Sequence, residues 1–311
     1  MTSSDLVKLI FLAAVWGGSF IFMRISVPEF GVIFMAALRI SLAGLSLLLF
    51  AYMNRIPMLW RKNIKFYVVV GFFSAALPFS CFSYAAQFLP SAYSAVINST
   101  APLFGALFSI FWLSDRLSLR RLTALFLGIT GVTVLVGAGT LILNIHTLLA
   151  TLAGLIASAS YAISSILIKK LGQTPSTVSG ESAEKGIHPY AMASGSLVMG
   201  GLMLSPAIPF SIPTLIPSTT ATLSLLALSL MSTALAQAIF IPLISRIGPT
   251  RAMTVTFLIP VFGMLWGYLF LHENVGISTI VGSAIVLMAM GLILSPAKPI
   301  TAEAELKPDV P

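Results

Sequence analysis

Two segments of this chain share one pattern. Residues 89–117 read LPSAYSAVINSTAPLFGALFSIFWLSDRL, and residues 247–275 read IGPTRAMTVTFLIPVFGMLWGYLFLHENV. They align without gaps, so that Pro102-Leu103-Phe104-Gly105 falls on Pro260-Val261-Phe262-Gly263 and Asp115 falls on Glu273. Shorter matches extend the alignment towards both ends of the chain, and such self-similarity is typical of a duplicated unit. The sequence therefore predicts two related halves.

The composition places most of the chain in a membrane. Of 311 residues, 58% are hydrophobic and 8% are charged, and the mean hydropathy is +1.01. A soluble domain has about 25% charged residues, and one core could not bury this much apolar surface. These values exclude a soluble enzyme, a nucleic-acid-binding module and a disordered scaffold. The net charge of +8 is typical of basic residues that flank membrane spans.

Apolar runs of about 20 residues, the length that crosses the hydrocarbon core, recur along the chain. We expect helices at residues 6–24, 32–53, 66–89, 91–113, 119–139, 148–168, 188–205, 221–245, 250–271 and 275–294. The uncharged stretch from Phe66 to Ser114 must divide at Leu89-Pro90-Ser91, because proline cannot continue a helix and so long a helix fits no bilayer. The predicted fold class is an all-α, multi-pass integral membrane protein with ten transmembrane helices.

Five helices in each half determine the orientation of the second half. Because five is odd, the second half must cross the membrane in the opposite sense, which is the inverted-repeat plan of many secondary transporters. We place the first repeat at residues 1–145 and the second at 146–294, with a polar loop at 172–186 and a disordered cytoplasmic tail at 295–311.

The basic residues predict which side faces the cytoplasm. With the N-terminus inside, only Arg24 falls on the outer side and Arg39 lies within a helix, which leaves 15 of the 17 Lys and Arg residues on the inner side. Because cytoplasmic loops are enriched in Lys and Arg, we expect both termini in the cytoplasm.

Pro102 and Pro260 interrupt helices at equivalent positions of the two halves. Each lacks the donor for the carbonyl four residues earlier, and interrupted helices mark substrate sites in inverted-repeat transporters. One interpretation is that both prolines are hinges on a cavity wall, and the other is that they only kink packed helices. The amide of Asn98 is likewise a substrate contact or an interhelical hydrogen bond.

Arg39 is the one unambiguous charge within the membrane, where an arginine costs roughly 2.5 to 3.5 kcal/mol on insertion scales. It either attracts an anionic group, such as a substrate carboxylate, or bonds carbonyls at helix ends and stabilises the fold. No acidic residue is expected at its depth, so a carboxylate relay for protons has no obvious place.

Aromatic and amide side chains are further candidates for a cavity wall. They are Trp16, Tyr84, Gln87, Tyr93, Tyr161, Gln237, Trp266 and Tyr268. Each is also explained by helix packing or by anchoring at the membrane interface. We predict a substrate site of Trp16, Arg39, Tyr84, Asn98, Tyr161, Gln237 and Trp266. We expect no catalytic residue, metal or cofactor, because Cys81 is the single cysteine and the three histidines lack ligand spacing.

These features together resemble one family. The Trp16-Gly17 start, an arginine in the second helix, and the Pro-Leu-Phe and Asp115-Arg116-Leu117 ending of the fourth helix are similar to the EamA family of the drug/metabolite transporter superfamily. The resemblance covers the chain from about residue 7 to 294. It implies a carrier of the bacterial inner membrane, usually thought of as an exporter of amino acids or related metabolites, with a cavity between the halves. Asp115, where the family more often has Glu, is a mild departure.

We therefore expect a secondary, non-ATP transporter that exports amino acids or related small metabolites by alternating access. Its expected partners are a small-molecule substrate and the lipid bilayer, without nucleic acid. We do not expect an enzyme, because phosphate-loop and zinc-helix motifs are missing from the sequence. The alternatives are an importer or facilitator of similar solutes and, in another class, a membrane-embedded scaffold or enzyme. Glycine-rich faces leave both a monomer and a homodimer open.

Overall fold

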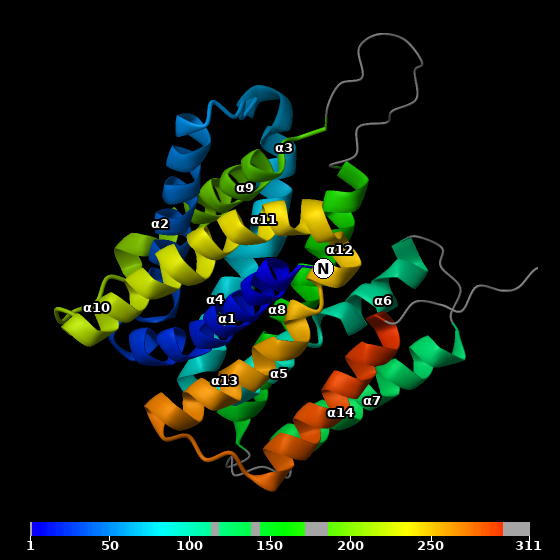
Figure 1. Cartoon of the computed structure of the whole chain (residues 1–311). Helices are drawn as coiled ribbons and strands as arrows, with labels where there is room; N and C mark the ends of the chain where they lie inside the picture. The colour runs from blue at the N-terminus through cyan, green and yellow to red at the C-terminus, as the bar shows by residue number, and fades with distance from the viewer. Residues whose placement is uncertain (1, 113–117, 138–143, 172–185, 295–311) are drawn as a thin grey trace, which may run out of the picture.

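The structure, a computed structural model, describes residues 2–112, 118–137, 144–171 and 186–294. Its described residues form helices and short connections (Figure 1). The first half contains α1 (Ser3–Phe30), α2 (Val32–Met53), α3 (Trp60–Gly71), η1 (Phe72–Ala76), α4 (Leu77–Phe88), α5 (Ser91–Asn98), α6 (Ala101–Trp112) and α7 (Leu119–Gly137). The second half contains α8 (Ile145–Leu171), α9 (Pro189–Leu204), η2 (Ser205–Phe210), α10 (Thr219–Leu226), η3 (Ala227–Leu235), α11 (Ala236–Ile247), α12 (Pro249–Ala252), α13 (Val255–Leu271) and α14 (Ile277–Leu294).

These helices make the predicted all-α membrane fold. Within the described residues, 9 helical stretches are long and apolar enough to cross a membrane, and α13 is a shorter apolar helix at the position of the predicted span 250–271. The predicted division at Leu89-Pro90 is confirmed, since α4 ends at Phe88 and α5 begins at Ser91. The extended backbone of Leu89 and Pro90 breaks the helix there.

The first helix is longer than the predicted residues 6–24. It continues through Arg24 and Pro28 to Phe30, and Gly31, at a φ of +73°, joins it to α2. Arg24 does not end the helix because its guanidinium donates to the carbonyl oxygens of Ala86 and Gln87, at 2.9 and 3.2 Å. A charged residue with such partners can remain within a helix near the end of a span.

Corresponding helices of the two halves have corresponding neighbours. Helix α2 packs against α9, and α7 against α14 (Figure 1). Helix α1 packs against α13 and against α10, η3 and α11, while α8, in the same place of the second half, packs against α5, α6 and α4. These relations support the predicted duplication. The boundaries 1–145 and 146–294 and the orientation of the termini stay predictions.

Both halves also carry a π-helical segment at the same position of the repeat. The segments are η1 and η3, and they contain Ser74 and Ser232, which the repeat aligns. A π-helical turn shifts the face of the helix that follows it, and such turns are frequent at functional sites.

The fifth and tenth spans, α7 and α14, approach closely through glycines. A Cβ atom added to Gly131 would lie 3.0 Å from the carbonyl oxygen of Gly282, which leaves no room for a side chain. The glycine-rich faces therefore pack against each other within one chain, as small residues allow between membrane helices. Three predictions lie outside the described residues or almost so: the site of Asp115, the loop 172–186 except its last residue, and the tail 295–311.

Candidate functional site: a cavity between the two halves

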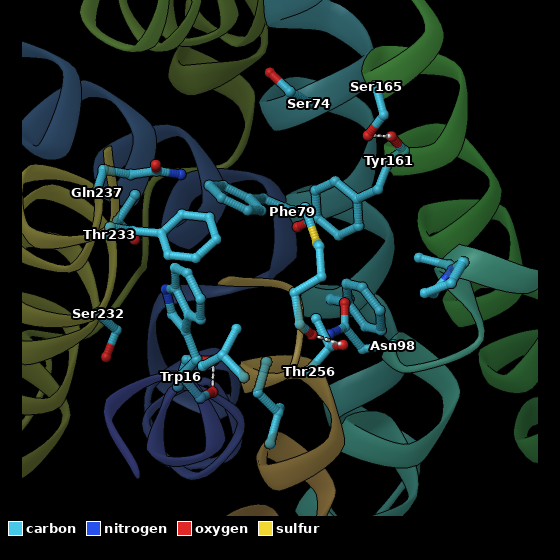
Figure 2. A pocket seen from close by; sticks show the side chains of 18 of the residues that line it. Trp16, Ser74, Phe79, Asn98, Tyr161, Ser165, Ser232, Thr233, Gln237 and Thr256 are labelled. Atoms are coloured by element: carbon cyan, nitrogen blue, oxygen red, sulfur yellow. Dashed lines mark hydrogen bonds between the residues drawn. The ribbon is translucent and has the colours of Figure 1, made fainter. Parts of the chain in front are cut away.

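A cavity of about 400 Å³ lies between the two halves (Figure 2). Its wall comes from α1, α2, η1, α4, α5 and α6 of the first half and from α8, η3, α11, α13 and α14 of the second half. The polar or charged residues that line it are Ser19, Arg39, Ser74, Asn98, Tyr161, Ser165, Ser232, Thr233, Gln237 and Thr256. Most of the remaining wall is aromatic or aliphatic, so the cavity suits a small solute with an apolar body and a polar group.

The cavity runs from a buried end to an exposed one. At the buried end lie Met23 and Arg39, which are 1% and 6% exposed. At the other end lie Ser165 and Met253, both exposed, and within about one helical turn of them are the exposed side chains of Lys169 and Arg251. The cavity thus opens towards the end of the molecule where basic residues gather.

Five of the seven predicted substrate contacts line this cavity. They are Trp16, Arg39, Asn98, Tyr161 and Gln237, and the predicted hinge residue Pro102 lines it as well. These residues come from α1, α2, the break between α5 and α6, α8 and α11, so the tertiary structure brings together side chains that are far apart in sequence. Figure 2 shows Gln237 and Tyr161 on opposite sides of the Phe79 ring.

The other two predicted contacts lie in packed helices outside the cavity lining. The ring of Tyr84 lies 5.3 Å from that of Phe88 in a cluster of apolar side chains. The indole N–H of Trp266 donates to the carbonyl oxygen of Ala14 at 3.0 Å, and its ring stacks on Phe262. Tyr84 and Trp266 therefore pack between helices, and neither belongs to the candidate site.

Arg39 has partners inside the cavity wall, but none of them is an anion. Its Nε donates to the hydroxyl of Thr233 at 3.2 Å, and Nη1 lies 3.4 Å from the sulfur of Met23. The guanidinium carbon Cζ lies over the Phe79 ring, 3.8 Å from its centroid, a cation–π contact. The Thr233 hydroxyl donates in turn to the carbonyl of Leu228 within η3, at 2.8 Å, so it presents a lone pair to Arg39.

The two predicted hinges differ in their surroundings. Helix α5 ends at Asn98 and α6 begins at Ala101, so Pro102 stands in the first turn after a break, where its missing N–H leaves no bond unmade. Pro260 lies inside the continuous helix α13 and is buried, while the break of the second half, between α12 and α13, falls at Met253 and Thr254. The hinge roles stay predictions, and only Pro102 lies at a break.

Hydroxyl groups satisfy carbonyls at both breaks. Ser99 and Thr100 donate to the carbonyls of Val96 and Ile97, at 2.6 and 2.7 Å. In the second half Thr254 donates to Arg251 and Thr256 donates to Met253, at 2.7 and 2.6 Å. These side chains bond the backbone locally, and at the first break Ser158 of α8 also donates to the carbonyl of Ile97, at 2.8 Å.

Several lining residues were missed by the sequence interpretation. Thr233 and the aligned pair Ser74 and Ser232 lie in the π-helical segments, and their repeat equivalence was the signal that could have found them. Phe79 and Phe82 also line the cavity, but nothing separates these rings from the other phenylalanines in the sequence.

The end opposite the opening is held by carboxylates that bond helix N-termini. Glu273, just after α13, accepts from the backbone N–H of Ser91 at 2.9 Å and from its hydroxyl at 2.7 Å. Arg24 lies 3.9 Å from the same carboxylate. Glu29 accepts from the Ser218 hydroxyl at 2.7 Å and also from its backbone N–H. Each bond joins one half to the other, and a carboxylate at a helix N-terminus is favoured by the helix dipole.

This fold and cavity define a multi-pass membrane transporter, and comparison with known proteins gives its family. The model of the EamA-like transporter family matches twice, at residues 6–137 and 148–295, so the chain belongs to the EamA-like transporter family. The two matches fall on the two predicted halves.

Two of the similar proteins are also named as transporters. The uncharacterized transporter YoaV of Bacillus subtilis is 22% identical, over 89% of this chain and 92% of YoaV. The uncharacterized inner membrane transporter YedA of Escherichia coli is 26% identical, over 94% of this chain and 92% of YedA. A WAT1-related chloroplastic protein of Arabidopsis thaliana is 27% identical, over 90% of this chain and 67% of that protein.

The fold is also found among solved structures. One crystal structure superposes with a TM-score of 0.64 at 14% identity, over 94% of this chain and 96% of that chain, which shows a shared fold. With its apolar helices and its family match, the chain is a multi-pass membrane transporter.

Proposed function

We propose that this protein is a secondary carrier that exports small organic solutes, such as amino acids or related metabolites, by alternating access. The observation that supports this proposal is the central cavity, which reaches exposed residues at one end and is bordered at the other by bonds between the halves. A carrier needs a site that one end at a time can reach.

The exposed end of the cavity is the cytoplasmic one in this proposal. Exposed Lys169, Lys170, Arg246 and Arg251 lie at this end, and basic residues favour the cytoplasmic side. Both termini then lie in the cytoplasm, and the described conformation is inward-open. A solute enters from the cytoplasm, after which the halves rearrange and the bonds of Glu273 and Glu29 break to open the outer end.

The break before Pro102 is the place where one wall of the cavity can bend. Pro102 and Asn98 flank the Ser99–Thr100 break and both line the cavity. The direction of net transport follows the solute gradient and any coupled ion. No acidic residue is among those that line the cavity in the described part of the chain, which favours a carrier whose cavity binds solute without a carboxylate relay.

The test is flux into liposomes that contain only the purified protein. A panel of labelled amino acids and other small metabolites is supplied with and without an imposed proton gradient. We expect saturable uptake of one solute class, absent from protein-free liposomes. A scaffold gives no flux with any solute, so a complete lack of saturable uptake overturns the proposal.

Two glycines provide matched variants for this test. Gly105 lines the cavity and Gly137 lies on an exposed helix face, and a Cβ atom added to either meets nothing within 4 Å. Gly105→Leu fills space in the cavity and should reduce flux at least tenfold. Gly137→Leu adds the same side chain elsewhere and should leave flux unchanged. Equal flux in both variants would place the transport path outside this cavity.

A further inference from the structure

The charges of the cavity limit the solutes it can accept. Arg39 is the one charged side chain among the residues that line it in the described part of the chain, and arginine keeps its charge at all ordinary pH values. The cavity therefore carries a single positive charge in an otherwise neutral and largely apolar wall.

The alternative role of Arg39, which is to stabilise the fold by bonding backbone carbonyls, is not supported by its contacts. That alternative requires carbonyl oxygens at helix ends as acceptors. Among the described residues, the hydrogen-bond partners of Arg39 are a threonine hydroxyl and the sulfur of Met23, a weak acceptor. The other N–H groups of the guanidinium have no such partner. A buried cation is stabilised when an anion or several acceptors face it. A solute bound in the cavity can supply such a group to Arg39.

The carboxylates of the described residues are engaged elsewhere. Asp5 pairs with Arg246, Glu29 accepts from Ser218 and Glu273 accepts from Ser91. None of the three lines the cavity. A solute with an ammonium group would therefore meet Arg39 as a like charge and find no carboxylate to pair with, whereas an anion would find its partner.

The rest of the wall matches an apolar body with further hydrogen-bonding groups. The rings of Trp16, Phe79, Phe82 and Tyr161 line the cavity, and Tyr161 lies 6.3 Å from Phe82 in a stacked arrangement. The side-chain amides of Asn98 and Gln237 and the Ser74 hydroxyl also line it, and none of them bonds another described residue. Unused donors and acceptors in a cavity wall are available to a bound solute.

We propose that the cavity selects amphipathic organic anions: molecules with one carboxylate-like or sulfonate-like group, which pairs with Arg39, and an apolar or aromatic body without an ammonium group. This inference rests on the proposed function and narrows it. Among the solutes expected above, it favours acids related to amino acids over the zwitterionic amino acids themselves.

The test uses three solutes with the same phenylethyl body and different charges at neutral pH. They are 2-phenylethanesulfonate, an anion; phenylalanine, a zwitterion; and (2-phenylethyl)trimethylammonium, a cation. None crosses a bilayer readily, so uptake into proteoliposomes above protein-free liposomes measures the protein. We expect saturable uptake of the sulfonate at least tenfold faster than that of the other two solutes at equal concentration.

A pair of variants then tests the charge itself. Gln237→Glu places a carboxylate in the cavity with almost no change of shape, and Gln87→Glu makes the same change at an exposed position at the end of α4. Gln237→Glu should reduce sulfonate uptake at least tenfold, and Gln87→Glu should not reduce it. If Gln237→Glu does not elute as a folded protein in size-exclusion chromatography, Asn98→Asp makes the equivalent change on α5.

The outcomes separate this inference from the proposed function. Saturable flux that favours phenylalanine or the quaternary ammonium, or a preference for the sulfonate that Gln237→Glu leaves intact, overturns the inference and retains the carrier. Lack of saturable flux for these three solutes and for the whole metabolite panel overturns the carrier and the inference together.

Discussion

The two ends of the central cavity are bordered by different kinds of contact. At the closed end, carboxylates bond the N-termini of helices across the two halves, as Glu273 does with Ser91 and Glu29 with Ser218. Beside these bonds lies an apolar cluster that includes Phe20, Met23 and Phe82. At the open end, long basic side chains bond the carbonyls of helix C-termini, as Lys170 does with Trp112 and Arg120 with Leu292.

This difference shows that two halves with related sequences can close one end of the cavity and leave the other end open. The acidic bonds and the cluster fill the space between the halves at the closed end. At the open end Lys170 and Arg120 bond carbonyls and Arg246 pairs with Asp5, and Ser165 and Met253 stay exposed in the wall. The asymmetry arises from packing between the halves and not from the repeat in the sequence. In the proposed mechanism, the transport step opens the closed end of the cavity and closes the open end.

The largest expected effect comes from the packing of α1 on α13. A Cβ atom added to Gly17 would lie 2.7 Å from the Cβ of Phe262 and 2.9 Å from the backbone nitrogen of Gly263, whereas one added to Gly18 meets nothing nearer than 3.7 Å. Gly17→Ala should destabilise the protein by about 3 kcal/mol through overpacking.

Gly18→Ala is the matched control, and it should be neutral or slightly stabilising, since alanine is the better helix former. Thermal unfolding of both variants in detergent measures the difference. Equal melting temperatures would mean that α1 and α13 do not approach as closely as described.

An intermediate effect is expected from weakening the closed end. Glu273→Gln keeps the shape of the side chain but removes its charge, and hydrogen bonds to charged groups are stronger than neutral ones by about 1.4 kcal/mol, which is about tenfold in an equilibrium. The half-buried thiol of Cys81 packs against the apolar cluster of this end. Its rate of modification by a water-soluble maleimide should therefore rise about tenfold in the variant.

Two controls accompany this measurement. Adding Cys81→Ser must abolish the labelling, because Cys81 is the single cysteine. Asp5→Asn breaks a pair with Arg246 at the opposite end and should not raise the rate. An unchanged rate in Glu273→Gln would mean that its bonds to Ser91 do not hold this end closed.

The smallest effects are expected from the two prolines, and they should be unequal. Pro102→Ala restores an N–H at the break between α5 and α6 and favours one continuous helix, so we expect a several-fold slower flux. Pro260→Ala changes a helix that is already continuous through this residue, and its flux should stay within about twofold of that of the unaltered protein. Proteoliposome flux measures both, and unchanged flux in the double variant would exclude the hinge role.

Much of the fold could be predicted because its signals are local. Hydropathy over about 20 residues defines a span, and Pro90 ends a helix wherever it is packed. The helix that begins at Ser3 shows the limit of this reasoning. The predicted helix ended at residue 24, but Arg24 bonds the carbonyls of Ala86 and Gln87, which lie more than 60 residues away, and the helix continues to Phe30.

The candidate site was predicted in part for the same reason. Trp16, Arg39, Asn98, Tyr161 and Gln237 are unusual side chains for their spans, and the cavity contains all five. Tyr84 and Trp266 are equally unusual but face other helices. Residue type alone cannot separate these cases, because the face of a helix that meets a cavity depends on how the helix is rotated against its neighbours.

The sequence by itself determined the membrane class, the apolar spans, the duplication and the presence of an arginine within the second span, because composition and local pattern carry each of these. The tertiary structure alone decided that Arg39 faces Thr233, Met23 and Phe79 instead of carbonyls, that Pro102 and Pro260 have different surroundings, and that one end of the cavity is closed. Each of these features depends on contacts between segments far apart in the chain, and such contacts follow from how the helices pack.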